Sequence, residues 1–330
     1  MKIKSTSRRR VTLGLMGASV AGILPSMVRA ESGYPARPIR VVIGFAAGGG
    51  ADAVARLICT SMSADLKQPM VIENRPGANG NIAADVVTKA TNDGYTILYN
   101  TSSLVISPHL YTSLPYDIKR DLLPVAEVAA IPLVLVVSPR LGVKSMQEFV
   151  ANLKANPRKL NYGSSGTGNI THLSAAEFLR QVGAKASHVP YKSEAPAVTD
   201  LLGGHIDFYI GNANTLIPHV ADKKLTALAV TSLQRLPSLP DVPTLDQTVA
   251  KGLEMVAWSG FMVPKGTPDA VIAKLASTAE RVLKTQTLRS RIEETGAMVR
   301  WAGTSEYGRI LESETDRWGK AVKASGVRPE

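Results

Sequence analysis

Two glycine-rich loops, far apart in the chain, most constrain what this sequence can fold into. The first is Gly44-Phe45-Ala46-Ala47-Gly48-Gly49-Gly50-Ala51-Asp52, and the second is Tyr162-Gly163-Ser164-Ser165-Gly166-Thr167-Gly168. Each follows a short apolar, strand-like run and precedes an amphipathic, helix-like run. Such a junction exposes peptide N–H groups at a helix N-terminus, where an anion binds well. Two such loops in two halves of the chain predict an anion held between two lobes.

Strand-like and helix-like runs alternate along the whole chain, which predicts an α/β fold with mainly parallel sheets. Helices are expected after each glycine loop, with Asp52 as the N-cap of the first, and from the capping-box pattern at Ser145. A further helix is expected from Thr267-Pro268 onward. The expected strands are residues 39–43, 71–72, 95–99, 133–137, 188–191, 206–210, 225–231 and 256–263. We interpret 133–137 and 256–263 as the two crossings between the lobes.

Residues 1–30 are predicted to be a signal peptide. A positive segment precedes a short apolar run, and Val28-Arg29-Ala30 offers small residues at the two positions that a signal peptidase reads. The segment Ser7 to Leu13 also resembles a twin-arginine signal, so the Sec and twin-arginine routes both stay open. No later apolar run is long enough to cross a membrane. The mature protein is therefore expected to be soluble in the periplasm.

The formal charge of +11 overstates how basic the mature protein is. Residues 1–30 hold six of the positive charges and no acid, so without them the charge falls to +5. This mild balance suits small anions, and aromatic residues are only 5% of the chain, which argues against a nucleic-acid partner. The single cysteine, Cys59, falls in the apolar pattern of the first helix and is expected to be a buried thiol.

Neither loop matches a catalytic or nucleotide-binding motif. The first has neither the G-x-G-x-x-G order nor a following Gly-Lys-Ser/Thr. In the second, Gly163 and Ser165 fit G-x-S-x-G but Thr167 does not, so Ser164 and Ser165 are interpreted as hydroxyl donors. An exported serine hydrolase with His172 as base stays an alternative, as does a purely structural turn at either loop alone. The histidine spacing fits no metal site, and no cofactor is expected.

Motifs spread over almost the entire mature chain resemble one known family. They are Tyr34-Pro35, Pro38 to Arg40, Phe45 to Gly49 with Asp52, Val71 to Gly80, Asp93 to Thr96, Leu114 to Asp117, Tyr162 to Gly168 with His172, His188 to Tyr191, Pro240 to Thr244, Trp258, and Pro264 to Pro268. In this order and spacing, the chain resembles the Bug family, the solute receptors of tripartite tricarboxylate transporters.

The resemblance implies a two-lobed periplasmic-binding-protein fold, type II-like, with the ligand cleft between the lobes. Lobe 1 is expected to comprise residues 31–133 and 259–330, and lobe 2 residues 134–258. The implied function is binding of a small organic carboxylate and its delivery to integral-membrane transporter subunits. The receptor is expected to be a monomer that performs no chemistry. A receptor that serves a sensor system instead is the alternative within binding.

The resemblance and the loop pattern together predict the ligand-binding residues. These are Phe45, Ala46, Ala47, Gly48, Gly49, Ala51, Asp52, Ser164, Ser165, Gly166, Thr167, Gly168, His172, Tyr191 and Asp207. For Asp207, capping of a backbone turn is an equal alternative. The chain departs from the family at Gly44 (usually Pro), Ala51 (usually Thr or Ser), Asn169 (usually Ser) and Lys192-Ser193-Glu194 (usually Lys-Gly). These departures leave the identity of the carboxylate open.

Overall fold

A computed structural model describes residues 33–327 of the 330-residue chain. The helices and strands of these residues belong to one unit of the chain, Pro35–Glu330. The predicted signal peptide lies outside the described residues. Within residues 33–327, no helix is both long enough and apolar enough to span a membrane.

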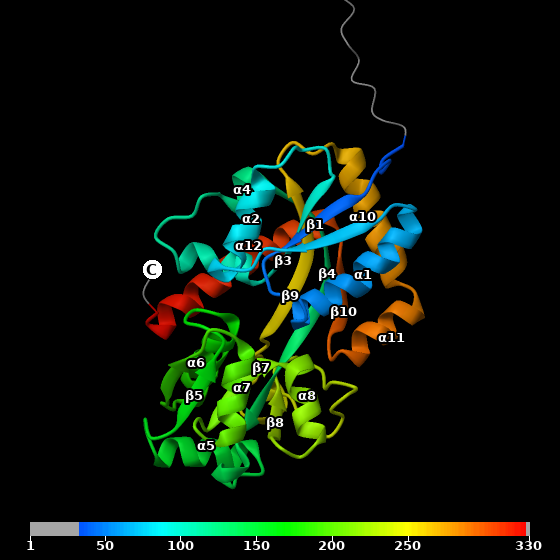
Figure 1. Ribbon diagram of the computed structural model, residues 1–330. Coiled ribbons are helices and arrows are strands. Elements are labelled where there is room, and N and C mark those ends of the chain that lie inside the picture. The colour runs from blue at the N-terminus through cyan, green and yellow to red at the C-terminus, as the bar shows by residue number, and fades with distance from the viewer. Residues whose placement is uncertain (1–32, 328–330) are drawn as a thin grey trace, which may run out of the picture. The chain divides into compact units, whose positions relative to one another are not determined.

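Two groups of strands share one long strand, β4 (Figure 1). In the first group, three parallel strands in the order β2-β1-β3 are followed by antiparallel β9 and the first part of β4, onto which β10 also pairs. Both faces of β1 are covered, which suits its Ile-Val composition. The bounds are β1 Ile39–Ile43, β2 Met70–Asn74, β3 Thr96–Thr101, β4 Leu122–Val137, β9 Val256–Pro264 and β10 Met298–Ala302.

In the second group, β5 pairs in parallel with β6 and β7, and residues 133–137 of β4 pair antiparallel with β7 and β8. The chain thus passes from the first group to the second along β4 and returns at the start of β9. The bounds are β5 Asn161–Ser164, β6 Ser187–Pro190, β7 Phe208–Asn212 and β8 Thr226–Val230.

Helices cover these strands and join them. Their bounds are α1 Gly50–Leu66, α2 Asn81–Thr88, α3 Ser103–Ile106, α4 Ile118–Asp121, α5 Met146–Ala155, α6 Ile170–Val182, α7 Glu194–Gly203, α8 Ala213–Ala221, α9 Leu245–Thr248, α10 Asp269–Leu283, α11 Gln286–Glu294 and α12 Thr304–Ser325. Three short 3₁₀ turns are η1 Ala78–Gly80, η2 Ser107–His109 and η3 Pro139–Leu141. The long C-terminal helix α12 packs on β4 and is fastened to β9 by Glu314, which accepts hydrogen bonds from the indoles of Trp258 (3.0 Å) and Trp318 (2.9 Å).

Three local predictions differ from the structure. The strand predicted at 133–137 is the end of a sixteen-residue strand, because β4 continues backward through Pro124, Glu127 and Pro132. Prolines and a charge hide this part of the strand from hydropathy patterning, and its pairing with β9 contains register irregularities. The region after Thr267-Pro268, for which only a helix was expected, also contains the strand β10. The prediction of Asp52 as N-cap is wrong, because α1 begins at Gly50 with Gly49 as its N-cap.

Candidate functional site

The first glycine loop lies at the carboxyl edge of the first group of strands, between β1 and α1. Ala46 to Gly49 are exposed, and Gly48 has a φ of +80°, a backbone conformation that favours glycine. The peptide N–H groups of Ala47, Gly50 and Ala51 donate to no acceptor within residues 33–327. The loop therefore presents free donors at the N-terminus of a seventeen-residue helix.

The buried side chain of Asp52 stabilises this loop through hydrogen bonds. The residue is 1% exposed, and its carboxylate accepts hydrogen bonds from the Gly48 N–H (2.9 Å), from Arg56 (2.8 and 3.0 Å) and from the Asn74 amide (2.9 Å). Burial alone would raise the pKa of Asp52, but the hydrogen bonds from Arg56, Asn74 and Gly48 outweigh it and leave the pKa lowered. Both of its carboxylate oxygens accept hydrogen bonds from the loop and its neighbours, which is the geometry of a support for the loop.

The second glycine loop lies at the carboxyl edge of the second group of strands, between β5 and α6. Three peptide N–H groups of this loop already donate to acceptors within the protein. The Ser165 N–H donates to Thr171 Oγ1 (2.9 Å), the Gly166 N–H to Ser164 Oγ (3.3 Å) and the Gly168 N–H to His172 Nδ1 (3.0 Å). Thr167 is exposed, and its N–H and hydroxyl have no acceptor within the described part of the chain. Thr167 is thus the free donor of this loop.

A buried histidine, His172, and a half-buried one, His188, support the second loop. The rings of His172 and His188 stack with centroids 3.7 Å apart, and a 2.6 Å hydrogen bond joins His188 Nε2 to Ser164 Oγ. Burial, reinforced by the neighbouring His188, lowers the pKa of His172 to about 3, and burial lowers that of His188 to about 4. Both rings are therefore neutral at neutral pH, and His172 cannot act as a cationic anchor.

Ser164 has a histidine within hydrogen-bond reach, but its burial keeps the hydroxyl from a substrate. It is fully buried, and its hydroxyl donates to the Gly166 carbonyl (3.1 Å) while it bonds His188. The base expected for a hydrolase, His172, instead accepts the Gly168 N–H. The Ser164 hydroxyl therefore stabilises the conformation of the loop through its hydrogen bonds with Gly166.

Contacts between the two groups of strands bring the loops to one boundary. The Asn169 amide, just after the second loop, lies 3.5 Å from the Asn79 side-chain oxygen, and Asn79 belongs to the turn that packs on Gly44. On the other side, a Cβ added at Gly50 would come within 2.1 Å of the Asn214 amide of α8. Both loops therefore face the boundary between the lobes.

The predicted ligand-binding residues Tyr191 and Asp207 both bind other protein groups through their side chains. The Tyr191 hydroxyl donates to Asp200 of α7 (2.6 Å), although the Tyr191 N–H bonds the Ser164 carbonyl and so keeps the residue beside the second loop. Asp207 precedes β7, and its carboxylate accepts the N–H of Asn161 (2.7 Å), where the parallel strand β5 begins. The second loop follows the opposite end of β5. The structure therefore does not bring Asp207 together with the glycine loops, and it fits the alternative of a turn-capping residue.

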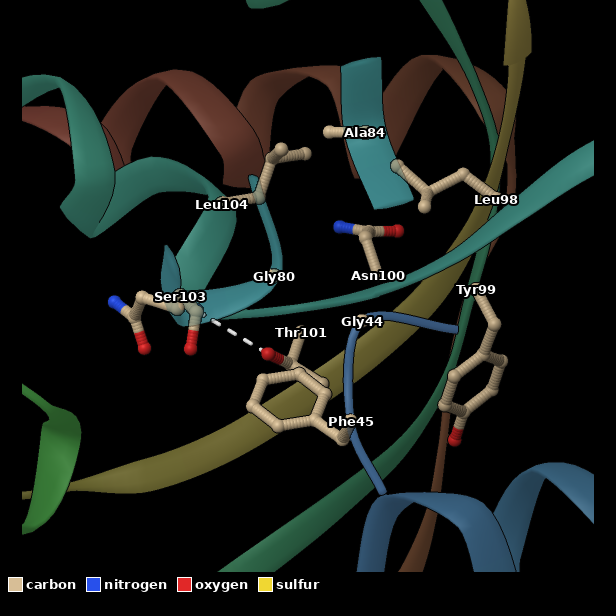
Figure 2. A pocket seen from close by; sticks show the side chains of 11 residues that line it. Gly44, Phe45, Gly80, Ala84, Leu98, Tyr99, Asn100, Thr101, Ser103 and Leu104 are labelled. Carbon is tan, nitrogen blue, oxygen red and sulfur yellow. Dashed lines mark hydrogen bonds between the residues drawn. The ribbon is translucent and has the colours of Figure 1, made fainter. Parts of the chain in front are cut away.

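A small cavity lies behind the first loop. It has a volume of about 10 Å³, and Gly44, Phe45, Asn79, Thr101 and Ser103 are among the residues that line it. Figure 2 shows the Asn100 amide among the labelled side chains of this cavity, and the Asn100 side-chain nitrogen has no hydrogen-bond partner within residues 33–327. The volume suits about one water molecule, which this nitrogen would bind.

A larger cavity of about 430 Å³ lies away from both loops, between α4, β4 and α12. Its lining is mainly apolar, and the Lys119–Glu312 ion pair (3.0 Å) lies on exposed side chains beside it. It shares no residue with either glycine loop.

Sequence reasoning missed Asn79 and Asn214 as residues of the boundary between the two loops. Asn79 adopts φ +55° in a turn between Gly77 and Gly80, which both have positive φ. Its Pro-Gly and Asn-Gly neighbours indicate a turn, but the bond to Asn169 joins residues far apart in sequence, and no local pattern predicts it.

The fold and the two facing loops define a two-lobed periplasmic solute-binding protein. The structure of Rpa4515 from R. palustris with adipate is similar, with a TM-score of 0.83 and 33% identity over 90% of this chain and 100% of that chain. That of the periplasmic binding protein BugD has a TM-score of 0.79 and 32% identity over 90% of this chain and 100% of that chain. The structure of MatC from Rhodopseudomonas palustris with bound malate has a TM-score of 0.76 and 30% identity over 88% of this chain and 100% of that chain.

Sequence comparison leads to the same class. Residues 54–327 match the family model described as the tripartite tricarboxylate transporter family receptor. Protein BugT of Bordetella pertussis is 34% identical over 297 residues, which are 89% of this chain and 91% of that protein. The chain belongs to the tripartite tricarboxylate transporter receptor family, as the motifs from Tyr34 to Pro268 predicted. Its members are solute receptors, so the prediction that this protein is not an enzyme is confirmed.

Proposed function

We propose that this protein is a periplasmic receptor that binds a small organic carboxylate between its lobes and delivers it to a tripartite tricarboxylate-type membrane transporter. The observation that carries the proposal is the pair of glycine loops that face one boundary with free, uncharged donors at helix N-termini. Adipate and malate in the related structures are carboxylates of this kind. Export to the periplasm rests on the predicted signal peptide, residues 1–30.

The proposed anchor for one ligand carboxylate is smaller than the predicted list of residues. It comprises the N–H groups of Ala47, Gly50 and Ala51 on one side and the N–H and hydroxyl of Thr167 on the other. Uncharged donors at helix N-termini hold a carboxylate without an arginine. The remaining predicted residues, Asp207 excepted, act in this proposal as walls or supports. They are Phe45, Ala46, Gly48, Gly49, Asp52, Ser164, Ser165, Gly166, Gly168, His172 and Tyr191.

The proposed division into lobes is residues 31–133 with 259–330, and residues 134–258. Thr231 supports a hinge near this division, because its hydroxyl accepts the Leu133 N–H (2.9 Å) and also contacts the carbonyls of Leu133 and Met255. One side chain thus ties the outgoing segment to the returning one. Closure of lobes about a hinge is the usual response of this fold class to a ligand.

A thermal-shift screen of mono-, di- and tricarboxylates tests the proposed function. A receptor that binds one of them is stabilised once the ligand exceeds its dissociation constant, by about 2.7 kcal/mol at a hundredfold excess. We expect at least one carboxylate to raise the melting temperature without being consumed. A screen in which amines or sugars stabilise the protein and no carboxylate does would contradict the proposal.

Calorimetry on Gly49→Val tests the anchor itself. A Cβ at Gly49 would lie 3.4 Å from the nearest atom, the Ala46 carbonyl oxygen, so the variant has room to fold while its side chain covers the donors. We expect a large loss of affinity for the carboxylate found in the screen. Cys59→Ala, a buried change away from the loops, is the matched control and should bind as the wild type does. Wild-type affinity in Gly49→Val would place the ligand elsewhere.

A further inference from the structure

Three loops meet at the carboxyl edge of the second group of strands. Strands β5, β6 and β7 are parallel, so the segments that follow them lie at the same edge. The glycine loop follows β5, Glu194 opens α7 shortly after β6, and Asn212 ends β7 just before α8. Glu194 therefore belongs to the edge that carries the second glycine loop.

The Glu194 carboxylate occupies the N-terminus of α8. It accepts hydrogen bonds from the Asn212 N–H (2.8 Å), the Asn212 amide (2.9 Å) and the Thr215 hydroxyl (3.1 Å). Burial raises the pKa of Glu194, and these hydrogen bonds oppose that effect. The pKa stays raised on balance, but all three partners are donors, the arrangement that an ionised carboxylate accepts, and none of them is a cation.

This helix terminus faces the first lobe. Asn214, in the first turn of α8, packs its amide against Gly50 of the first glycine loop. The Asn214 side-chain oxygen is buried and has no hydrogen-bond partner within residues 33–327. At the first turn of α8, the second lobe thus brings an unpaired amide oxygen against the first loop, and the Glu194 carboxylate lies at the same helix terminus; both are acceptors.

We propose that Glu194 is a specificity-determining residue that fills the α8 N-terminus with the protein's own carboxylate, so that the receptor takes monocarboxylates with an uncharged or cationic distal group. This inference rests on the proposed function, in which the glycine loops anchor one ligand carboxylate. An empty α8 N-terminus would attract the second carboxylate of a diacid through its N–H groups and dipole. In this protein the Glu194 carboxylate occupies the α8 N-terminus, so the second carboxylate of a diacid would meet a like charge. A distal amine, amide or hydroxyl would instead find hydrogen-bond acceptors there.

Calorimetry with ligands matched in length tests the inference on the wild-type protein. One series is butyrate, 4-aminobutyrate and succinate, and the other is hexanoate, 6-aminohexanoate and adipate. Within a series only the distal group changes, from methyl to ammonium to carboxylate. If the screen finds a carboxylate of another length, its own mono- and diacid pair is added. We expect the diacid to bind about tenfold or more weakly than the tighter of its two partners, because like charges placed together across a binding site are costly.

Glu194→Gln keeps the shape of the side chain and removes its charge, so the diacid penalty should largely disappear. Glu306→Gln changes an exposed carboxylate on α12 and should leave the penalty as in the wild type. The ligand series is measured on the wild-type protein, so it tests the inference even if Glu194→Gln folds poorly. A diacid that binds wild type as tightly as its matched monoacids would overturn the inference while upholding the proposed function. A screen with no carboxylate ligand at all would overturn both.

Discussion

Replacing Asp52 by alanine should weaken both the fold and the binding site, although Asp52 itself is buried. The change removes the acceptor of the Gly48 N–H, of the Asn74 amide and of Arg56. Hydrogen bonds to a charged group contribute about 1.5–3 kcal/mol each, but the Arg56 side chain is 50% exposed and its pairing contributes little. We therefore expect the free energy of unfolding to fall by about 2–4 kcal/mol.

The same change should cost ligand affinity through the loop. Without the bond from Gly48, the first loop must be ordered when the ligand binds, and such ordering costs about tenfold in affinity. Urea unfolding followed by circular dichroism gives the stability, and calorimetry with the ligand found in the screen gives the affinity.

Arg56→Met is the matched control for this prediction. It breaks the ion pair on its exposed side and leaves Asp52 to hold Gly48 and Asn74, so it should cost about 1 kcal/mol or less in stability and little affinity. Equal losses in the two variants would mean that the ion pair, and not the buried support of the loop, is what matters. An Asp52→Ala protein with wild-type affinity would refute the role of this network in binding.

The pH dependence gives a further check on Asp52. Its pKa is lowered in the folded protein from the ordinary value of 3.8. A group with a lowered folded-state pKa adds stability that is fully present above its unfolded-state pKa and is lost as the pH falls through the folded-state pKa. The difference in unfolding free energy between wild type and Asp52→Ala should therefore be constant above about pH 5 and shrink below about pH 4.

Three further outcomes follow from the structure. Thr167→Val should lower ligand affinity by about 1–3 kcal/mol in calorimetry, since it leaves a carboxylate oxygen without its hydroxyl donor, and wild-type affinity would remove Thr167 from the anchor. Glu314→Gln should lower the free energy of unfolding by about 1–2 kcal/mol and shift the fluorescence of Trp258 and Trp318, because their indoles lose a charged acceptor; an unchanged spectrum would contradict this. The Cys59 thiol, 2% exposed and with a pKa raised to about 12 by burial, should not react with a thiolate-selective reagent until the protein unfolds, and rapid labelling of the folded protein would show this wrong.

The sequence by itself determined the class, the family and the place of the two loops. Glycines between an apolar run and an amphipathic run specify a strand-to-helix junction through local backbone freedom and local burial, so Gly48 and Gly168 could be placed without knowing what lies opposite them. The same local rules succeeded for β1, whose residues are apolar apart from Arg40. They failed where long-range pairing overrides composition, as at Pro124 and Glu127 in β4.

Only the tertiary structure decided which members of each loop are free to meet a ligand. Ser164 and Thr167 look equally suited to donate when read in sequence, but His188, which is distant in the chain, takes the first and leaves the second exposed. Asp52 likewise receives the Asn74 amide from β2, and Glu194 receives its partners from the end of β7 and from α8. Whether a donor or a carboxylate is satisfied depends on which distant groups surround it, and hydrogen bonds between segments far apart in the chain leave no periodic trace in the sequence.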